Sequence, residues 1–261
     1  MPDSSHDRAG GAAPARAAAG VAWAGLAALA IAMGVGRFAF TPLLPMMRAD
    51  AGLSLAAAGW LASANYLGYL LGALTAARLP TSVAIRGGLL LIAAVTFGMG
   101  IGQDFIFWLT LRLLAGVASA WVLVQVSAWA LERLAQLQRP ALSGAVFAGV
   151  GAGIAGAGAL CMVLMHADIA SGRACELLGL LSLLLAAATW SAFDSTPRST
   201  IHAPAQANRQ RVAWSADTIR LTLCYGAFGF GYIIPATFLP AMARQLVADP
   251  AIFGWAWPVF G

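Results

Sequence analysis

The sequence contains no lysine, and only 10% of its 261 residues are charged. Soluble domains have roughly a quarter of their residues charged, so this shortage excludes an ordinary soluble protein. Hydrophobic residues make up 61% of the chain, and the mean hydropathy is +0.80. The composition therefore predicts a polytopic membrane protein.

The strict alternation of polar and apolar residues that is typical of a membrane β-barrel is also missing. Apolar runs of about 20 residues are present instead, and each can cross the hydrocarbon core as a helix. The fold class expected is therefore all-α, with seven membrane helices and the start of an eighth at residue 251. The seven helices are expected at about residues 21–46, 54–77, 87–102, 105–131, 141–165, 175–193 and 218–243.

Carboxylates are absent from the middle of the expected spans, and the histidines lie in loops or in the N-terminal tail. A membrane-embedded enzyme would need clusters of such groups, so no catalytic residue is expected. The three cysteines have no metal-ligand spacing and are interpreted as packing residues, so neither a metal nor a cofactor is expected. A titratable group inside the membrane is usual for proton coupling, so a proton as the coupling ion stays open.

All fifteen basic residues are arginines, and their distribution predicts the orientation. In a soluble protein a formal net charge of +5 would suggest nucleic acid, but here the arginines gather in alternate loops, which follows the positive-inside pattern. We expect a multi-pass protein of the inner membrane with a cytoplasmic N-terminus. The cytoplasmic set is Arg8, Arg16, Arg78, Arg86, Arg133, Arg139, Arg198, Arg209, Arg211 and Arg220, and the opposite set is Arg48, Arg173 and Arg244.

Four regions are expected along the chain. Residues 1–19 form a cytoplasmic tail, 20–193 a six-helix transmembrane bundle, 194–216 a polar cytoplasmic linker, and 217–261 the beginning of a second bundle. Because the chain stops inside the expected eighth helix, we expect either a fragment or a truncated gene product.

One apolar segment occurs twice. Residues 34–47 match residues 229–242 without gaps at an offset of 195. Paired broken hydrophobic segments in two halves are typical of transporters built from repeats, and they indicate the binding site. The helix-breaking and gating residues predicted from this repeat are Gly34, Gly36, Pro42, Pro45, Gly229, Gly231, Pro235 and Pro240.

Arg37 lies near the middle of the first expected span, where an isolated charge is costly and needs a partner. At α-helical spacing it shares a face with Gly34 and Thr41. We interpret this face as an anion site or gating charge that faces an aqueous cavity. The alternative is a structural arginine bonded to the carbonyls of the broken helix.

Three further residues are candidates for the substrate cavity. Arg112 either contacts solute, takes part in proton coupling, or ties the fourth helix to the backbone of the first. Asn65 either lines the cavity or bonds between helices. Tyr232 occupies the position of Arg37 in the second repeat.

The chain resembles the major facilitator superfamily, and within it the bacterial YbfB/YjiJ type. The resemblance rests on Gly34-Val-Gly-Arg-Phe-Ala-Phe-Thr-Pro-Leu-Leu-Pro45, on Asn65-Tyr-Leu-Gly-Tyr69, and on Arg112 followed by Gly116 and small residues. It implies two six-helix halves with inverted repeats around a central cavity. The loop at Gly72–Arg78 lacks the aspartate of the superfamily signature, and Ile154 stands where antiporters carry a proline, so import and export both stay open.

The function expected is secondary active transport of a small organic solute, anionic by hypothesis, by alternating access across the bilayer. The partners expected are therefore the solute and the lipid, with no nucleic acid. The alternatives are a non-transporting remnant or membrane sensor and, less favoured, a membrane-embedded enzyme.

Overall fold

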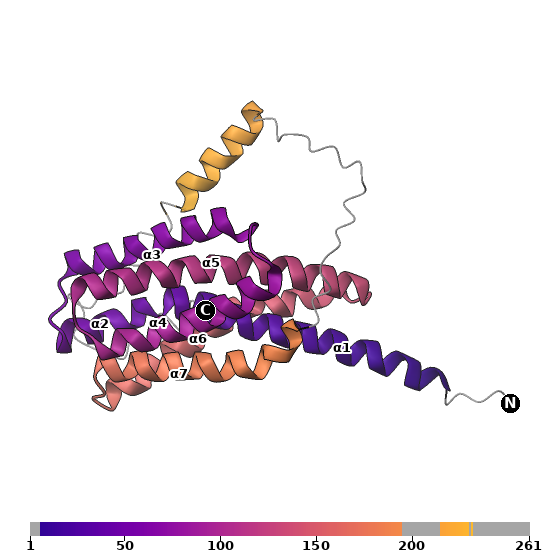
Figure 1. Ribbon diagram of the computed structural model, residues 1–261, viewed down its shortest axis with the longest axis horizontal. Coiled ribbons are helices and arrows are strands. Elements are labelled where there is room, and N and C mark those ends of the chain that lie inside the picture. The colour runs from indigo at the N-terminus through magenta and orange to yellow at the C-terminus, as the bar shows by residue number, and fades with distance from the viewer. Residues whose placement is uncertain (1–5, 195–214, 230, 232–261) are drawn as a thin grey trace. The chain divides into compact units, whose positions relative to one another are not determined.

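The computed structural model describes residues 6–194, 215–229 and 231, with side chains from residue 14 onward. The described residues belong to two compact units, 6–194 and the short segment from 215, and each is considered by itself. In the second unit, residues 216–229 are helical. The first unit is a bundle of long helices (Figure 1), in agreement with the predicted fold class.

The first membrane segment is helical in three parts. The helix α1 (His6–Leu29) continues into a π-helical segment, η1 (Ala30–Phe38), and then into α2 (Phe40–Asp50). The predicted break is therefore a change in helical pitch rather than an interruption. A π-helix bonds each N–H to the carbonyl five residues back, and such segments are frequent at functional sites.

The other helices follow the predicted order. They are α3 (Leu55–Ala76), α4 (Thr81–Ile101), α5 (Phe105–Gln136), α6 (Ser143–His166) and α7 (Ser171–Thr189), with short 3-10 turns at Pro140–Leu142 and Trp190–Phe193. The helix α4 begins six residues before the predicted residue 87, because Pro80 and Thr81 start a helix that its polar first turn had concealed. The helix α5 continues past the predicted residue 131 to Gln136.

Five segments among the described residues are long and apolar enough to cross a membrane. They contain α1 with η1 and α2, and then α4, α5, α6 and α7. The helix α3, which was predicted as a span, is not among the five. Its 22 residues nevertheless extend about 33 Å at 1.5 Å per residue, and they include no charged residue.

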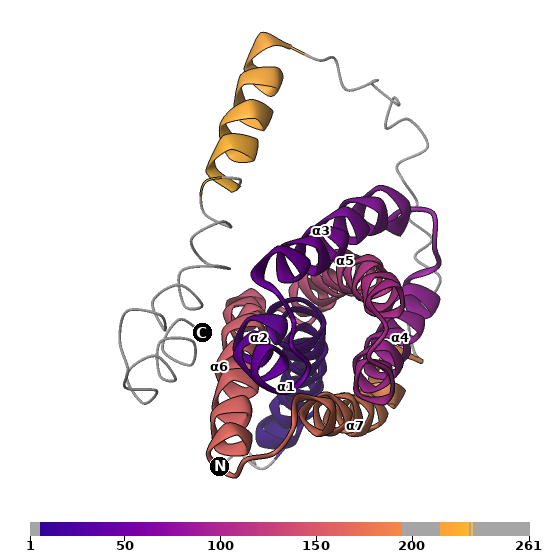
Figure 2. The same cartoon turned by 90° about the vertical axis from the view of Figure 1, so that its left-hand side faces the viewer.

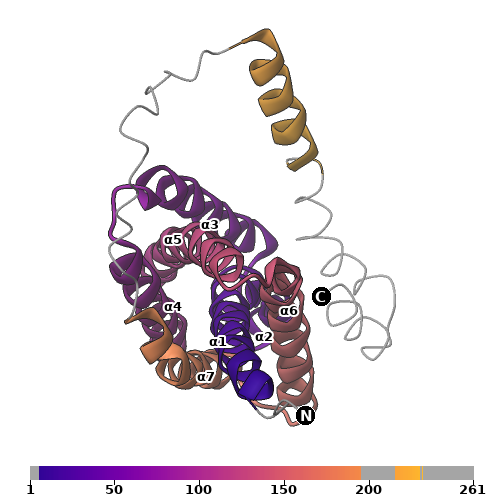
Figure 3. The same ribbon diagram turned by 90° about the vertical axis from the view of Figure 1, so that its right-hand side faces the viewer.

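The first membrane segment is the centre of the bundle. Residues of α1 and η1 share one buried core with α4, α5, α6 and α7. The helix α6 lies beside α1, α4 lies between α5 and α7, and α3 lies against α5 at the edge (Figures 2 and 3). A charge on η1 is therefore close to several helices at once.

Glycines make two of these contacts close. A Cβ at Gly68 or Gly72 of α3 would overlap a carbonyl oxygen of α5, and a Cβ at Gly116 of α5 would overlap the Asn65 carbonyl oxygen. A Cβ at Gly34 of η1 would likewise overlap the backbone of Gly153 in α6. Small residues let helix backbones approach closely in lipid, where packing rather than hydrophobicity drives association.

Polar side chains fix the helix ends. The Ser54 hydroxyl accepts a hydrogen bond from the Ala57 N–H, at 3.1 Å, and the Asp104 carboxylate accepts one from the Phe107 N–H, at 2.8 Å. These N-caps satisfy backbone donors that the first turns of α3 and α5 leave free. They fix the starts of both helices at the end of the bundle that was predicted to face outward.

At the opposite end, α5 holds the turn between α3 and α4. The Gln125 amide donates to the Ala76 carbonyl at 2.7 Å and accepts a hydrogen bond from the Thr81 hydroxyl at 3.0 Å. Arg86 of α4 forms an ion pair with Asp194 and donates to the Trp190 carbonyl. Gln125 therefore bonds α5 to both sides of the turn between α3 and α4. This is the turn that lacks the superfamily aspartate.

Candidate functional site

The site is built around two backbone carbonyls of η1, those of Gly36 and Arg37, which accept hydrogen bonds from side chains of α3 and α5. Pro42 has no N–H, so it removes one backbone donor from the first turn of α2, which follows η1. The guanidinium Nη2 of Arg112 donates to the Arg37 carbonyl oxygen at 3.4 Å. A side chain of a neighbouring helix thus bonds to the backbone just before the proline-containing turn, which is how broken helices are tolerated in membranes.

Asn65 connects three helices at the same level. Its Nδ2 donates to the Gly36 carbonyl at 3.3 Å and to the Arg112 carbonyl at 2.9 Å. The side chain is 0% exposed, and its Oδ1 has no hydrogen-bond partner. Asn65 therefore bonds α3 to η1 and α5, which is the interhelical role given as its alternative above.

Arg112 lies inside the bundle. It is 5% exposed, and its guanidinium carbon lies 4.6 Å from the centre of the Phe40 ring. The Nε atom has no hydrogen-bond partner, and Arg112 forms no ion pair with any carboxylate of the described chain. This buried cation is thus held by a carbonyl and an aromatic ring.

Arg37 has a different environment, because it is only partly buried. Its guanidinium carbon lies 4.2 Å from the centre of the Tyr69 ring, 5.5 Å from that of Tyr66 and 5.4 Å from that of Phe38. A cation over an aromatic face gains roughly 0.5–2 kcal/mol. Its Nε is buried without a hydrogen-bond partner, and residues 6–194 supply it with no ion pair.

The three residues predicted to share one face do not all face the same helix. Gly34 packs against Gly153 of α6, whereas Arg37 lies over Tyr69 of α3. The assumption of α-helical spacing was wrong for this segment, because η1 has more residues per turn than an α-helix. Thr41 follows in α2 and is partly buried.

The predicted helix-breaking residues of the first repeat have different structural roles. Gly36 lies against the Ser119 hydroxyl of α5, where a Cβ would overlap it. Pro42 and Pro45 lie within α2, directly after the π-helical segment. Glycine thus permits close packing, while proline removes backbone donors.

The second repeat is mostly outside the described residues. Tyr232, Pro235 and Pro240 lie outside the described residues, so their predicted roles stay predictions. Gly229 and Gly231 are described only as helical residues.

Tyr66 and Tyr69 were not among the predicted site residues. They were quoted only as part of a motif, although their i, i+3 spacing places them on one helix face. Two tyrosines on one face of a membrane helix, in a chain with an unpaired arginine, were the signal that could have identified them.

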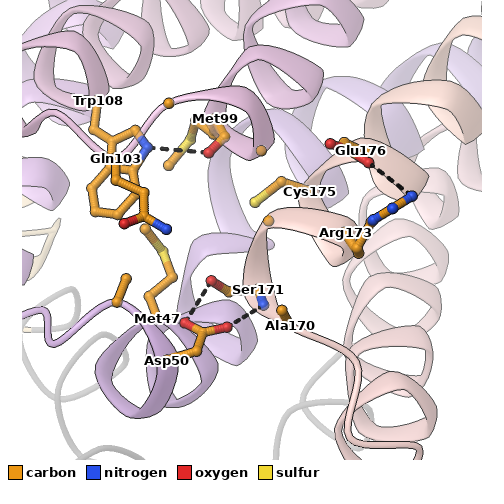
Figure 4. A pocket seen from close by; sticks show the side chains of 14 residues that line it. Met47, Asp50, Met99, Gln103, Trp108, Ala170, Ser171, Arg173, Cys175 and Glu176 are labelled. Carbon is orange, nitrogen blue, oxygen red and sulfur yellow. Dashed lines mark hydrogen bonds and ion pairs between the residues drawn. The ribbon is translucent and has the colours of Figure 1, made fainter.

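A pocket of about 270 Å³ opens at the end of the bundle where α2, α4 and α7 meet (Figure 4). Asp50 accepts hydrogen bonds from the backbone N–H and the hydroxyl of Ser171, and so caps α7. Arg173 and Glu176 lie across from it and form an ion pair at 3.8 Å. The wall of the pocket includes the buried side chains of Met99 and Cys175.

An all-helical bundle in which five of the described segments are long and apolar enough to cross a membrane indicates a multi-pass membrane protein. Over residues 29–261, the chain matches the family described as "Uncharacterised MFS-type transporter YbfB". The chain therefore belongs to this family of the major facilitator superfamily, as the resemblance predicted, and is a transporter of that type. The expected truncation is not borne out by this match, and no curated protein matches the chain.

Proposed function

We infer that the protein moves a small organic anion across the membrane by alternating access, and that Arg37 binds the anionic group. The observation that carries this inference is the environment of Arg37. It is a partly buried guanidinium on a central helix, and the described bundle gives it aromatic neighbours but no carboxylate. A solute carboxylate would supply the missing negative charge.

The aromatic neighbours support the same role. Tyr69 and Tyr66 hold the guanidinium from the α3 side, and its Nε has no hydrogen-bond partner. Hydrogen bonds that involve a charged group contribute about 1.5–3 kcal/mol each. Thr41, four residues further along, would add a hydroxyl to this site, and Tyr232, which the repeat pairs with Arg37, stays a predicted cavity residue.

Asn65 and Arg112 contribute to this proposal by holding the arginine segment. Both bond to carbonyls of η1, so they fix the backbone from which Arg37 projects. Their direct contact with solute, and the gating role of Gly229, Gly231, Pro235 and Pro240, stay predictions.

Orientation and location belong to the same proposal. The excess of arginine in alternate loops supports a cytoplasmic N-terminus in an inner membrane. The spans of the described bundle hold no carboxylate at mid-depth, which favours a coupling group elsewhere if protons are used.

The test is solute counterflow in proteoliposomes of the purified protein. Labelled succinate and benzoate serve as anionic probes, and labelled sorbitol serves as the uncharged control. We expect exchange of at least one anion, no exchange of sorbitol, and a loss of about 10- to 100-fold in Arg37→Gln, which is the loss of one charge-assisted hydrogen bond.

Unchanged exchange in a folded Arg37→Gln protein would remove this residue from the site. Anion binding measured by calorimetry without exchange would instead indicate a sensor. Exchange of sorbitol alone would contradict an anionic solute.

A further inference from the structure

Arg112 is a buried positive charge with no counter-charge among residues 14–194. The residue is 5% exposed, it has no ion pair within residues 14–194, and its Nε has no hydrogen-bond partner. A buried charge without a counter-charge is costly in a low-dielectric interior, and removing one partner of a buried pair is strongly destabilising. The contact with the Arg37 carbonyl, at 3.4 Å, is long for a hydrogen bond.

A small void lies directly beside this guanidinium. It has a volume of about 10 Å³, and its wall includes Arg112, Thr96, Phe40 and Cys175. A void of roughly 10–15 Å³ is the smallest that holds one water-sized particle. The void therefore has room for a single small guest.

The polar groups around the void are donors. Arg112 offers guanidinium N–H groups, Thr96 offers a hydroxyl and is 7% exposed, and Cys175 offers a weak S–H donor. The rest of the wall is apolar, and no carboxylate lines it. A site with one fixed positive charge and several donors favours an anion over a neutral or cationic guest.

We propose that this void is a site for a small monatomic anion, with chloride as its ordinary occupant, that neutralises Arg112 within the first bundle. The site lies between α2, α4, α5 and α7. It is separate from Arg37, which lies on the α3 side of η1.

The larger pocket at the end of the bundle shares part of its wall with this void. Met99 and Cys175 line both the 270 Å³ pocket and the small void. Figure 4 shows both side chains on the inner side of that pocket.

The experiment uses the purified protein in detergent, without organic solute. Its thermal unfolding midpoint is measured while bromide replaces gluconate at constant ionic strength, and anomalous scattering from bromide is recorded in crystals. We expect a saturable rise in the midpoint and an anomalous peak within hydrogen-bond distance of Arg112 Nε. Thr96→Val should weaken the apparent bromide affinity about tenfold, which corresponds to one hydrogen bond to a charged group.

Thr110→Val is the matched control. Its hydroxyl bonds to the Ile106 carbonyl in the turn before it, and it lies on the exposed face of the same helix as Arg112. This variant should keep the full bromide response.

Three results would overturn the proposal. The first is the absence of an anomalous peak at Arg112, and the second is an equal bromide response in Thr96→Val and Thr110→Val. The third is loss of the response in Arg37→Gln alone, because the halide would then occupy the proposed solute site. Failure of anion exchange in the transport assay would leave the bromide result unaffected, so the two proposals fail separately.

Discussion

Arg37 and Arg112 are the same residue type inside one bundle, yet their surroundings differ. Arg37 is partly buried on the rings of Tyr66 and Tyr69, while Arg112 is 5% exposed and bonds to the backbone of the Arg37 segment. The difference teaches that a charge inside a membrane protein does not by itself identify a binding residue. The exposure of the arginine and the type of its partner decide whether it can bind solute or whether it stabilises the fold.

The largest effect should come from the close contact that encloses Arg112. Gly68→Ala places a Cβ against the Leu113 carbonyl oxygen, so α3 and α5 must separate. Such overpacking costs about 1–3 kcal/mol, and the free energy of unfolding can be measured by denaturation in mixed micelles. Gly144→Ala is the control, because nothing lies within 4 Å of a Cβ there, and it should be neutral or slightly stabilising.

If Gly68→Ala and Gly144→Ala had the same unfolding free energy, the close α3–α5 contact would not contribute to stability. The assignment of Arg112 as a residue that supports the fold would then lose its structural basis.

Asn65→Leu should have an effect of similar size. It removes hydrogen bonds to the carbonyls of Gly36 and Arg112 while keeping a similar volume. Interhelical bonds in membranes contribute about 0.6 kcal/mol each, up to about 1.7, so a loss of roughly 1–3 kcal/mol is expected in the same denaturation assay. A variant as stable as the wild type would show that Asn65 does not hold η1, and solute contact would become its better explanation.

The smallest effect should appear on the Arg37 side. Tyr69→Leu removes the ring that lies 4.2 Å from the guanidinium, a contact worth about 0.5–2 kcal/mol. In the counterflow assay the KM for an exchanged anion should rise about 2- to 30-fold, with stability almost unchanged. Tyr69→Phe keeps the ring and removes only the hydroxyl that bonds to Arg37, so its KM should rise less than that of Tyr69→Leu, and an equal rise in both variants would argue against the cation–π contact.

Much of the bundle could be predicted because long apolar runs bounded by polar residues report helices directly. The order of all six segments in residues 20–193 was predicted, whereas the functional roles of Arg37 and Arg112 stay predictions. Helix starts were less accurate where a polar first turn, as at Thr81, resembled a loop.

The geometry around Arg37 could not be predicted. An assumed α-helical period put Gly34 and Arg37 on one face, but the π-helical segment η1 turns them toward different helices. The tyrosines of α3 were overlooked because only the tertiary fold brings them to the guanidinium. The spacing of residues in the sequence predicts which of them share a face of a regular helix. This prediction fails where the helical pitch changes.

The most direct test compares the water access of the two arginines. In a protein whose three cysteines are replaced by alanine, Arg37→Cys and Arg112→Cys are treated in membrane vesicles with a charged, water-soluble methanethiosulfonate, and the labelling rates are measured. Cysteine at position 37 should react at least about tenfold faster than at position 112, because only a solvated thiol forms the reactive thiolate readily. Equal rates, or faster labelling at position 112, would contradict the assignment of Arg37 to the solute path.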